Sequence, residues 1–418
     1  MSTVVAAPPV RTRTPAWSLA ALALGGFGIG TTEFATMGVL PDVTGDLGAS
    51  IPTGGHLVSA YALGVVVGAP LLAVLGARLP RKALLLALMA AFAVGNGLSA
   101  LAPSFGLLEL ARFGSGLPHG AYFGIASIVA AELVPERRGR AVARVMLGLT
   151  VANIVGVPLA TTLGQHLGWR STYWAVAVIG AVAVAAIARA VPAVPAADGA
   201  SPARELGALR RPLVLLTLAV GAVGFGGFFA VYSYISPTLT TLSGFSESAV
   251  PLALALFGLG MTVGTEAGGR LADRFVVGTI VTGMSATIVV LLLFTVTVHN
   301  PVTAGVTIFL IGASGSLTLP ALQTRLMDVA GDAQGLAAAG NHAALNIANA
   351  VGAYLGGLVL AAGYGYTAPA VVGALLGVGG LTVLGVSRAV ERRTAPATPP
   401  ARSAESPAAR SAESPAAR

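Results

Sequence analysis

The sequence predicts an all-α protein that crosses a membrane many times. Of its 418 residues, 55% are hydrophobic and 10% are charged, whereas about a quarter of the residues in a soluble globular domain are charged. The mean hydropathy is +0.83. Apolar runs long enough to cross a bilayer as helices recur along almost the whole chain.

Twelve of these apolar runs are predicted to be transmembrane helices. Their approximate limits are residues 17–40, 54–76, 83–101, 105–133, 141–164, 171–191, 212–241, 248–270, 276–298, 301–325, 336–361 and 366–388. The first run is longer than the apolar part of a signal peptide and no clean cleavage site follows it, so we expect it to be retained.

The segments outside the spans are polar or rich in proline. Residues 1–16 are expected to be a cytoplasmic N-terminal segment, and residues 192–211 a cytoplasmic linker. Residues 389–418 repeat the octapeptide SAESPAAR and have too little apolar surface to fold. We therefore expect them to form a disordered cytoplasmic tail.

Basic residues favour a cytoplasmic location for both termini. Arginine and lysine gather in the connectors after the even-numbered spans and near the chain ends, and the other connectors carry almost none. Positive charge marks cytoplasmic connectors, and an even span count agrees with this orientation. The net charge is +8, but it is spread over short connectors rather than one amphipathic face, so we expect no nucleic-acid partner.

A shift of 196 residues superposes the two halves of the chain. It pairs small and polar residues in four helix regions, among them Gly25 with Gly221, Leu63 with Leu259, Gly116 with Gly312, and Asn153 with Asn349. The repeat predicts two six-helix halves, residues 17–191 and 212–388, related by an axis along the membrane normal.

Glu33 is the strongest candidate for a functional group inside the membrane. It lies about 12 Å from the Pro41 end of the first span. A carboxylate is costly in hydrocarbon, and ionisable residues at this depth typically mark ion pathways. In a cavity wetted from alternate sides it can bind and release a proton; the alternative is a carboxyl permanently hydrogen-bonded between helices. Its counterpart in the second half is Phe229, which has no ionisable group.

Arg112 is the second candidate for proton coupling. It lies about 10 Å below the outer end of the fourth span, at a depth similar to that of Glu33. Opposite charges at matching depth can pair and separate during transport; a purely structural or snorkelling arginine is the alternative. His119 shares a helix face with Arg112 and is a candidate for proton relay or substrate binding, or a satisfied buried histidine.

A set of aromatic and polar residues within the spans is predicted to line a substrate cavity. Apolar and aromatic walls with a few polar groups suit a bulky lipophilic ligand, although each residue alone is also compatible with packing. The set comprises His119, Tyr122, Asn153, Phe229, Tyr232, Tyr234, Gln323 and Asn346.

Motifs for ATP-driven transport and for enzymatic activity are missing from the sequence. The one lysine, Lys82, is followed by Ala83, whereas a nucleotide-binding P-loop needs serine or threonine there. The chain has no cysteine, and neither a zinc-protease helix motif nor a hydrolase nucleophile elbow occurs. We therefore expect no enzyme activity, no metal and no cofactor other than a proton gradient.

Three passages resemble the major facilitator superfamily, in particular its twelve-span drug:proton antiporter and arabinose-efflux-like branch, which includes chloramphenicol-resistance-type exporters. They are TEF at 32–34 followed by MGVLP at 37–41, AVLGARLPRK at 73–82 with GRLADR at 269–274, and ANIVGVPL at 152–159 ending in GWR at 168–170. The likeness covers residues 15 to 390 approximately. It implies gating roles for Arg78, Arg81, Gly156, Pro158, Asp273 and Arg274, and it implies that only the first half handles protons.

The passage at 73–82 departs from the family pattern. It has Ala77 where aspartate is usual and Pro80 where glycine is usual, whereas the second half retains Asp273 and Arg274. The passage at 152–159 reads Gly-Val-Pro rather than Gly-Pro.

The resemblance implies a proton-coupled secondary transporter whose two halves rock around a central cavity. The expected cargo is a small amphiphilic compound, such as the antibiotic chloramphenicol, and a sugar or nucleoside is the alternative. A non-transporting receptor or scaffold is the competing class of function. The expected partners are the substrate, protons and the lipid bilayer, with a monomer as the working unit. The Arg-rich, Lys-poor composition favours the cytoplasmic membrane of a bacterium.

Overall fold

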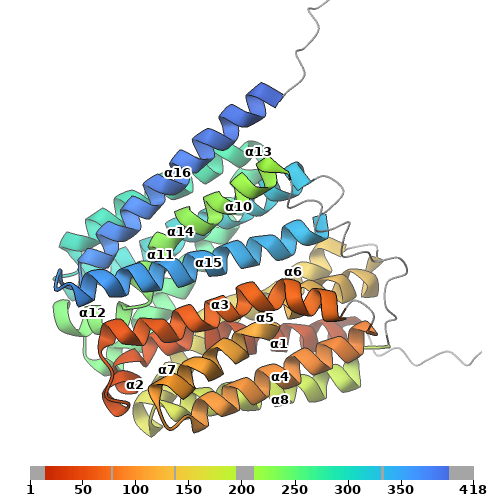
Figure 1. The fold of residues 1–418 in the computed structure, drawn as a ribbon, viewed down its shortest axis with the longest axis horizontal. Coiled ribbons are helices and arrows are strands. Elements are labelled where there is room, and N and C mark those ends of the chain that lie inside the picture. The colour runs from red at the N-terminus through yellow and green to blue at the C-terminus, as the bar shows by residue number, and fades with distance from the viewer. Residues whose placement is uncertain (1–14, 77–78, 136–137, 194–210, 331–333, 395–418) are drawn as a thin grey trace, which may run out of the picture.

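All regular secondary structure in the described part of the chain is helical. The computed structural model describes residues 15–76, 79–135, 138–193, 211–330 and 334–394 (Figure 1). The α-helices are α1 (Pro15–Gly38), α2 (Leu40–Asp46), α3 (Ile51–Gly76), α4 (Arg81–Leu101), α5 (Phe105–Leu133), α6 (Arg138–Val151), α7 (Val157–Leu167), α8 (Arg170–Ala190), α10 (Pro212–Gly224), α11 (Gly226–Tyr232), α12 (Ile235–Leu242), α13 (Val250–Thr297), α14 (Pro301–Ala330), α15 (Gln334–Ala361) and α16 (Ala368–Thr394).

Nine helical stretches of the described residues are long and apolar enough to cross a membrane. Helices α1 and α5 coincide with the predicted spans 17–40 and 105–133 but do not reach that apolar composition. Helix α13 contains two predicted spans, which meet at Phe275, where φ is −143° and ψ is 74°. The count of twelve spans and the cytoplasmic location of the termini stay predictions.

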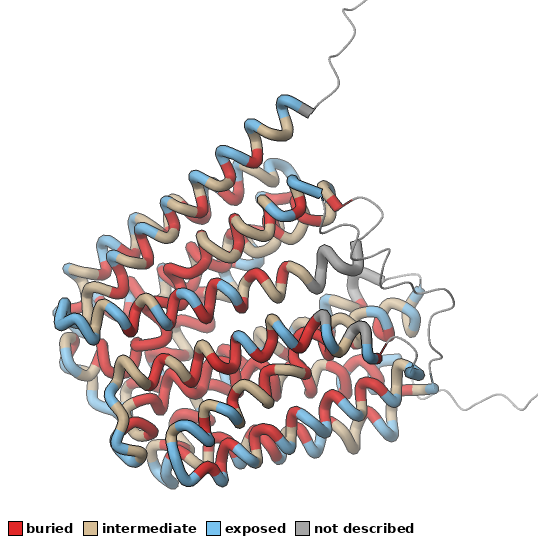
Figure 2. The backbone as a smooth tube through the Cα atoms, viewed as in Figure 1, coloured by how far each residue is buried: buried red, intermediate tan, exposed pale blue. Residues whose placement is uncertain are grey.

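The helices form two groups that lie side by side. In Figure 1, α1–α8 make up one group and α10–α16 the other, and α3 faces α15 across the boundary. Figure 2 shows buried residues concentrated inside the bundle and exposed residues along its outer helix faces. The predicted N-terminal segment up to residue 14, residues 194–210 of the linker and residues 395–418 of the tail lie outside the described residues.

Helix α16 extends six residues beyond the predicted limit at residue 388. Glu391 accepts hydrogen bonds from Arg388 at 2.8 Å and from Arg325 of α14 at 3.4 Å. These contacts continue the helix to Thr394, into the segment predicted to be disordered.

The two groups approach closely where glycines replace larger residues. We call the end of the bundle that carries α2 and α12 the α2 end, and the opposite end, where α8 ends and α10 begins, the linker end. Near the α2 end, a Cβ on Gly55 of α3 would overlap the Tyr234 hydroxyl, and one on Gly258 of α13 would overlap the Asn153 carbonyl. Glycine permits such backbone approach between membrane helices. Ser59 also donates a hydrogen bond to the Ala350 carbonyl at 3.0 Å.

A π-helical turn, η2 (Ala152–Gly156), interrupts the helix between α6 and α7. Pro158 follows it and has no N–H to donate to the preceding turn, and its ring excludes regular α-helical geometry there. The repeat-related segment around Gly352 has no proline and stays within the continuous helix α15. The two halves therefore differ in backbone geometry at this level.

Candidate functional site

Glu33 lies in a part of α1 that is enclosed on every side. All residues from Gly28 to Gly38 are buried, and Glu33 itself is 7% exposed. Protein therefore surrounds the carboxyl group, which does not face lipid. Glu33 makes no hydrogen bond or ion pair with another described residue, but it interacts electrostatically with Arg112, Tyr61 and Tyr232.

Arg112 of α5 is fully buried and bound to the residue that precedes Glu33. Its guanidinium donates to the Thr32 hydroxyl at 2.9 Å and to the Thr32 carbonyl at 3.0 Å. It also lies 4.4 Å from the ring centroid of Tyr61 and 5.3 Å from that of Tyr173. Aromatic faces attract a buried cation.

The Thr32 hydroxyl in turn donates to Oδ1 of Asn96 on α4 at 2.5 Å. Thr32 therefore joins three helices, α1, α4 and α5. The sequence places Glu33 and Arg112 at the same depth, but in the described structure they are not within ion-pair distance. Thr32 and Asn96 are polar residues inside otherwise apolar spans. This pattern could have predicted a hydrogen-bond network between the helices.

Aromatic side chains from the second group surround Phe34, the residue after Glu33. The ring centroids of Phe34 and Tyr232 are 5.3 Å apart with the rings edge to face, and those of Phe34 and Phe229 are 6.3 Å apart and stacked. Phe228 and Phe257 continue this aromatic cluster into α11 and α13. Two of the predicted cavity residues, Phe229 and Tyr232, thus lie beside the carboxyl-bearing turn.

The other predicted tyrosines are hydrogen-bonded to main-chain carbonyls. Tyr122 is buried in the first group and donates to the Leu22 carbonyl at 2.8 Å. Tyr234 donates to the Ala353 carbonyl of α15 at 2.7 Å. Gln323 is half-buried on α14. The described contacts do not bring these three residues together with Glu33.

Three buried asparagines carry amide atoms without a hydrogen-bond partner, and two of them, Asn153 and Asn349, are related by the repeat. Oδ1 of Asn153, Oδ1 of Asn346 and both amide atoms of Asn349 have no partner among the described residues. The three side chains are 5%, 3% and 0% exposed, respectively. An unsatisfied buried polar group costs about 1 to 3 kcal/mol, which makes these amides candidates for binding a ligand or water. Our cavity prediction omitted Asn349, although the repeat pairs it with Asn153.

The predicted gating residues fall into two different environments. Arg78 lies outside the described residues. Arg81, in the first turn of α4, forms an ion pair with Glu132 at the end of α5. Asp273 and Arg274 are exposed beside the bend at Phe275, and no described residue pairs with them. An ion pair therefore forms in the half that departs from the family pattern, since Arg81 reaches α5 without the aspartate that is usual in the family motif.

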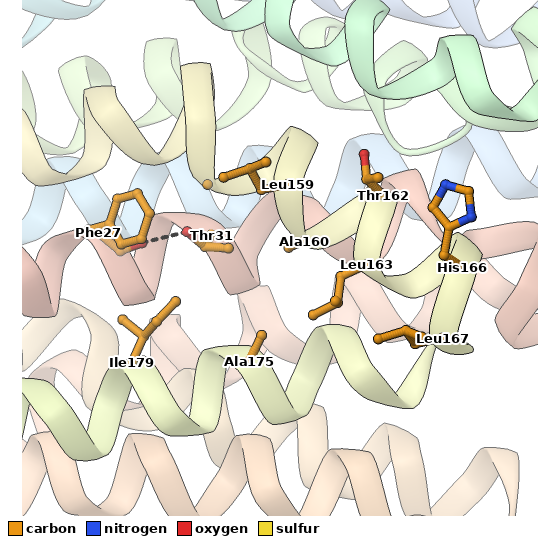
Figure 3. A pocket seen from close by; sticks show the side chains of 11 residues that line it. Phe27, Thr31, Leu159, Ala160, Thr162, Leu163, His166, Leu167, Ala175 and Ile179 are labelled. Carbon is orange, nitrogen blue, oxygen red and sulfur yellow. Dashed lines mark hydrogen bonds between the residues drawn. The ribbon is translucent and has the colours of Figure 1, made fainter.

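An apolar groove of about 620 Å³ lies between α1, α7 and α8 (Figure 3). Its lining includes Phe27 and Thr31 of α1, together with Ala160 of α7. Leu159 and Leu167 on its rim are 63% and 71% exposed. Of all the predicted site residues, only Gly156 borders this groove, so it is distinct from the predicted substrate cavity.

The sequence matches the family model described as Major Facilitator Superfamily over residues 22–340 and 235–416. The chain is 41% identical over 369 residues to the Inner membrane transport protein YdhP of Escherichia coli (strain K12), covering 88% of this chain and 94% of that protein. It is 35% identical over 344 residues to the Chloramphenicol resistance protein of Streptomyces lividans, covering 81% and 87%. Among solved structures, a D-xylose-proton symporter matches with a TM-score of 0.72 and 16% identity, covering 89% and 97%.

These matches extend over most of the chain and confirm the resemblance that the sequence motifs indicated. The likeness to the symporter concerns the fold alone, because the two sequences are only 16% identical. The protein is a multi-pass membrane transporter that belongs to the major facilitator superfamily.

Proposed function

We propose that this transporter exports a small amphiphilic organic compound in exchange for protons, with Glu33 as the proton-binding group. One observation carries the proposal. The Glu33 carboxyl is enclosed at the boundary between the two groups of helices, and no described residue forms a hydrogen bond or ion pair with it. A carboxyl group in this position can change its protonation without first breaking an ion pair.

The neighbours of Glu33 supply a route from protonation to movement. Phe34 belongs to α1, whereas Phe229 and Tyr232 belong to α11 of the second group. Rocking of one group against the other must separate or slide these rings, and it thereby changes the access of Glu33 to water. Arg112 stays tied to the first group through Thr32. Its positive charge favours the ionised carboxylate, whereas enclosure in protein favours the neutral acid.

The aromatic cluster supports an amphiphilic cargo. Flat apolar rings that surround a single ionisable group suit a compound with an aromatic body and a few polar substituents. The relative from Streptomyces lividans, which carries chloramphenicol resistance in its name, makes an antibiotic of that type the first compound to test.

A sugar or nucleoside is the second candidate cargo. The unpartnered Oδ1 atoms of Asn153 and Asn346 and the unpartnered amide of Asn349 favour it, because the hydroxyl groups of such a ligand can donate to these oxygens. An amphiphile without such groups would leave these atoms unsatisfied.

Transport in proteoliposomes tests the function directly. The purified protein is reconstituted with a trapped pH-sensitive dye, and chloramphenicol or arabinose is added on one side. We expect the wild-type protein to move protons in the direction opposite to the substrate, and the Glu33→Gln variant to move substrate without protons or not at all. Glu109→Gln is the matched control, because Glu109 is a half-buried carboxyl group in the first two turns of α5, near the α2 end, and no described residue forms an ion pair with it.

Drug resistance in an efflux-deficient host gives the cellular readout. Cells that express the wild-type protein should tolerate more of the transported compound than cells with the empty vector, and Glu33→Gln should abolish the difference. Proton flux and resistance that are equal in wild type and Glu33→Gln would remove this carboxyl from the mechanism.

A further inference from the structure

Two histidines from different halves meet at the boundary, away from Glu33. The ring centroids of His119 on α5 and His342 on α15 are 6.3 Å apart. Phe123 joins them: its ring is stacked on His342 at 5.5 Å and lies 5.4 Å from His119. His119 is 1% exposed and His342 is half-buried. His342 was not among the predicted site residues.

His119 is connected to the arginine network next to Glu33. Its Nδ1 lies 3.1 Å from the Tyr61 hydroxyl, and the ring of the same tyrosine lies under the Arg112 guanidinium. Seven residues separate Arg112 from His119, which places the histidine about 10 Å closer to the linker end. Tyr61 is thus shared between the proposed proton-exchange group and the histidine pair.

Few other titratable or charged groups face the histidine pair. Tyr61 of α3 and His119 of α5 face His342 from the first group. In its own group, α14 carries the exposed Asp328 and Arg325, which binds Ser387 and Glu391 of α16. Helix α11 carries Tyr232, and Tyr234, between α11 and α12, binds the Ala353 carbonyl. Helix α10 carries no charged residue. No described carboxylate forms an ion pair with either histidine.

We propose that His119 and His342 form a second proton-binding site, built from both halves, and that its protonation separates the halves towards the linker end. Neutral imidazoles pack against Phe123 and close the boundary at this depth. Protonation places positive charge on two facing rings in a site of low dielectric, and like charges there repel strongly. His342, which is half-buried, is the less enclosed of the two rings. Pro118, next to His119, removes a backbone hydrogen bond from α5 and eases bending at this level.

The proposal goes beyond the role assigned to Glu33, and only its link to transport rests on the proposed function. In that cycle the second site would open the linker end when protons are abundant. It would also make the second half a participant in proton binding, contrary to our expectation from the sequence that only the first half handles protons.

Pulsed electron paramagnetic resonance tests this second site. The chain has no native cysteine, so spin labels attach only at Leu75→Cys, near the linker end of α3, and Phe275→Cys, at the bend inside α13; both positions are exposed. The distance between the labels is measured in the otherwise unchanged protein at about pH 8 and in steps down to about pH 3, because an imidazole enclosed in protein is harder to protonate than one in water. We expect the long-distance population to grow at the lower pH.

Two substitutions decide the outcome. His342→Gln should abolish the pH-dependent shift, whereas His56→Gln should retain it, because His56 lies at the same α3–α15 boundary but contacts Tyr354 near the α2 end. A shift that is unchanged in His342→Gln, or lost equally in His56→Gln, would overturn the proposal. Unchanged far-ultraviolet circular dichroism of each variant verifies its fold.

The same labelled protein with Glu33→Gln separates this inference from the proposed function. If the pH-dependent shift persists there while wild-type liposomes show no proton exchange, the proposed function fails and the second site stands. If wild-type exchange is present and the wild-type label distance does not respond to pH, the second site fails and the proposed function stands.

Discussion

The guanidinium of Arg112 hydrogen-bonds to Thr32 and not to Glu33, one residue further along α1. This difference of one residue leaves an arginine buried without an ion pair, held by a hydroxyl, a carbonyl and two aromatic faces. Positive charge therefore persists next to the carboxyl group while the carboxyl remains available for a proton. Thr32 belongs to the TEF motif at 32–34, for whose threonine we predicted no role, and it is the residue that sets this geometry.

Replacing Thr32 by valine should weaken the fold. The substitution keeps the shape of the side chain but removes one acceptor from Arg112 and the donor to Asn96. We expect a loss of about 1 to 3 kcal/mol, because buried polar groups would be left unsatisfied. Thermal unfolding in detergent provides the measurement. Thr31→Val is the control, since the Thr31 hydroxyl bonds only to the Phe27 carbonyl of its own helix; equal losses in both variants would contradict the assigned role of Thr32.

A methyl group at Gly156 should hinder the turn at the π-helix. A Cβ at this position would overlap the Thr31 hydroxyl and press on the Phe27 ring. Overpacking of this kind costs about 1 to 3 kcal/mol, so Gly156→Ala should lower both the unfolding temperature and the transport rate. The control is Gly124→Ala on α5, where the added methyl group has no neighbour within 4 Å. Wild-type stability and rate in Gly156→Ala would show that the close approach to α1 is not required.

The Arg81–Glu132 ion pair should contribute only modestly to stability. Its side chains are 13% and 46% exposed, and pairs with such exposure contribute about 0.2 to 1 kcal/mol. A double-mutant cycle of Arg81→Gln and Glu132→Gln, followed by chemical unfolding, measures the coupling, which should fall as salt is added. Asp273→Asn is the control in the second half, where no described residue pairs with Asp273, and it should leave stability unchanged. A coupling energy near zero would mean that the pair is incidental.

Stability should fall in acid through Asp46, which lies outside the membrane spans. Hydrogen bonds from Arg170 and then from the Trp169 indole hold the pKa of Asp46 below its usual value. A carboxyl group with a lowered pKa in the folded state stabilises that state above the unfolded pKa of about 3.9, and the contribution disappears as the pH falls through the folded value. Asp46→Asn should therefore melt below the wild type at neutral pH and approach it in strong acid. Parallel melting curves at every pH would exclude this linkage.

The apolar runs and the repeat predicted the helical architecture well, because the length of an apolar run determines whether it can cross a bilayer. The predicted span 141–164 contains the interruption at Ala152–Gly156. Pro158 was the local signal for it, because proline disturbs only the turn that precedes it. The similar depth of Glu33 and Arg112 in their helices suggested that they pair, but Arg112 binds Thr32 instead. Depth follows from counting residues, but the rotation of α5 about its axis follows from how neighbouring helices pack, and that rotation selects Thr32 over Glu33.

Contacts between the halves were the least accessible to sequence reasoning. His119 was a candidate from its place on α5, whereas His342 acquires meaning only because α15 crosses the boundary beside Phe123. Its repeat-related position is Met146, so the internal symmetry gave no signal. Asn349 differs: the repeat already paired it with Asn153, and that correspondence could have placed it in the predicted cavity.

The π-helical turn at Ala152–Gly156 has no counterpart in α15, and this makes the two seams between the halves mechanically unequal. Along one boundary, α13 packs against η2 and α7, where the helix is interrupted by the π-helical turn. Along the other boundary, α3 packs against the continuous helix α15. When one group tilts against the other, we expect the interrupted segment α6–η2–α7 to bend and the continuous helix α15 to stay straight. The boundary between α13 and α7 should therefore open more widely than the boundary between α3 and α15.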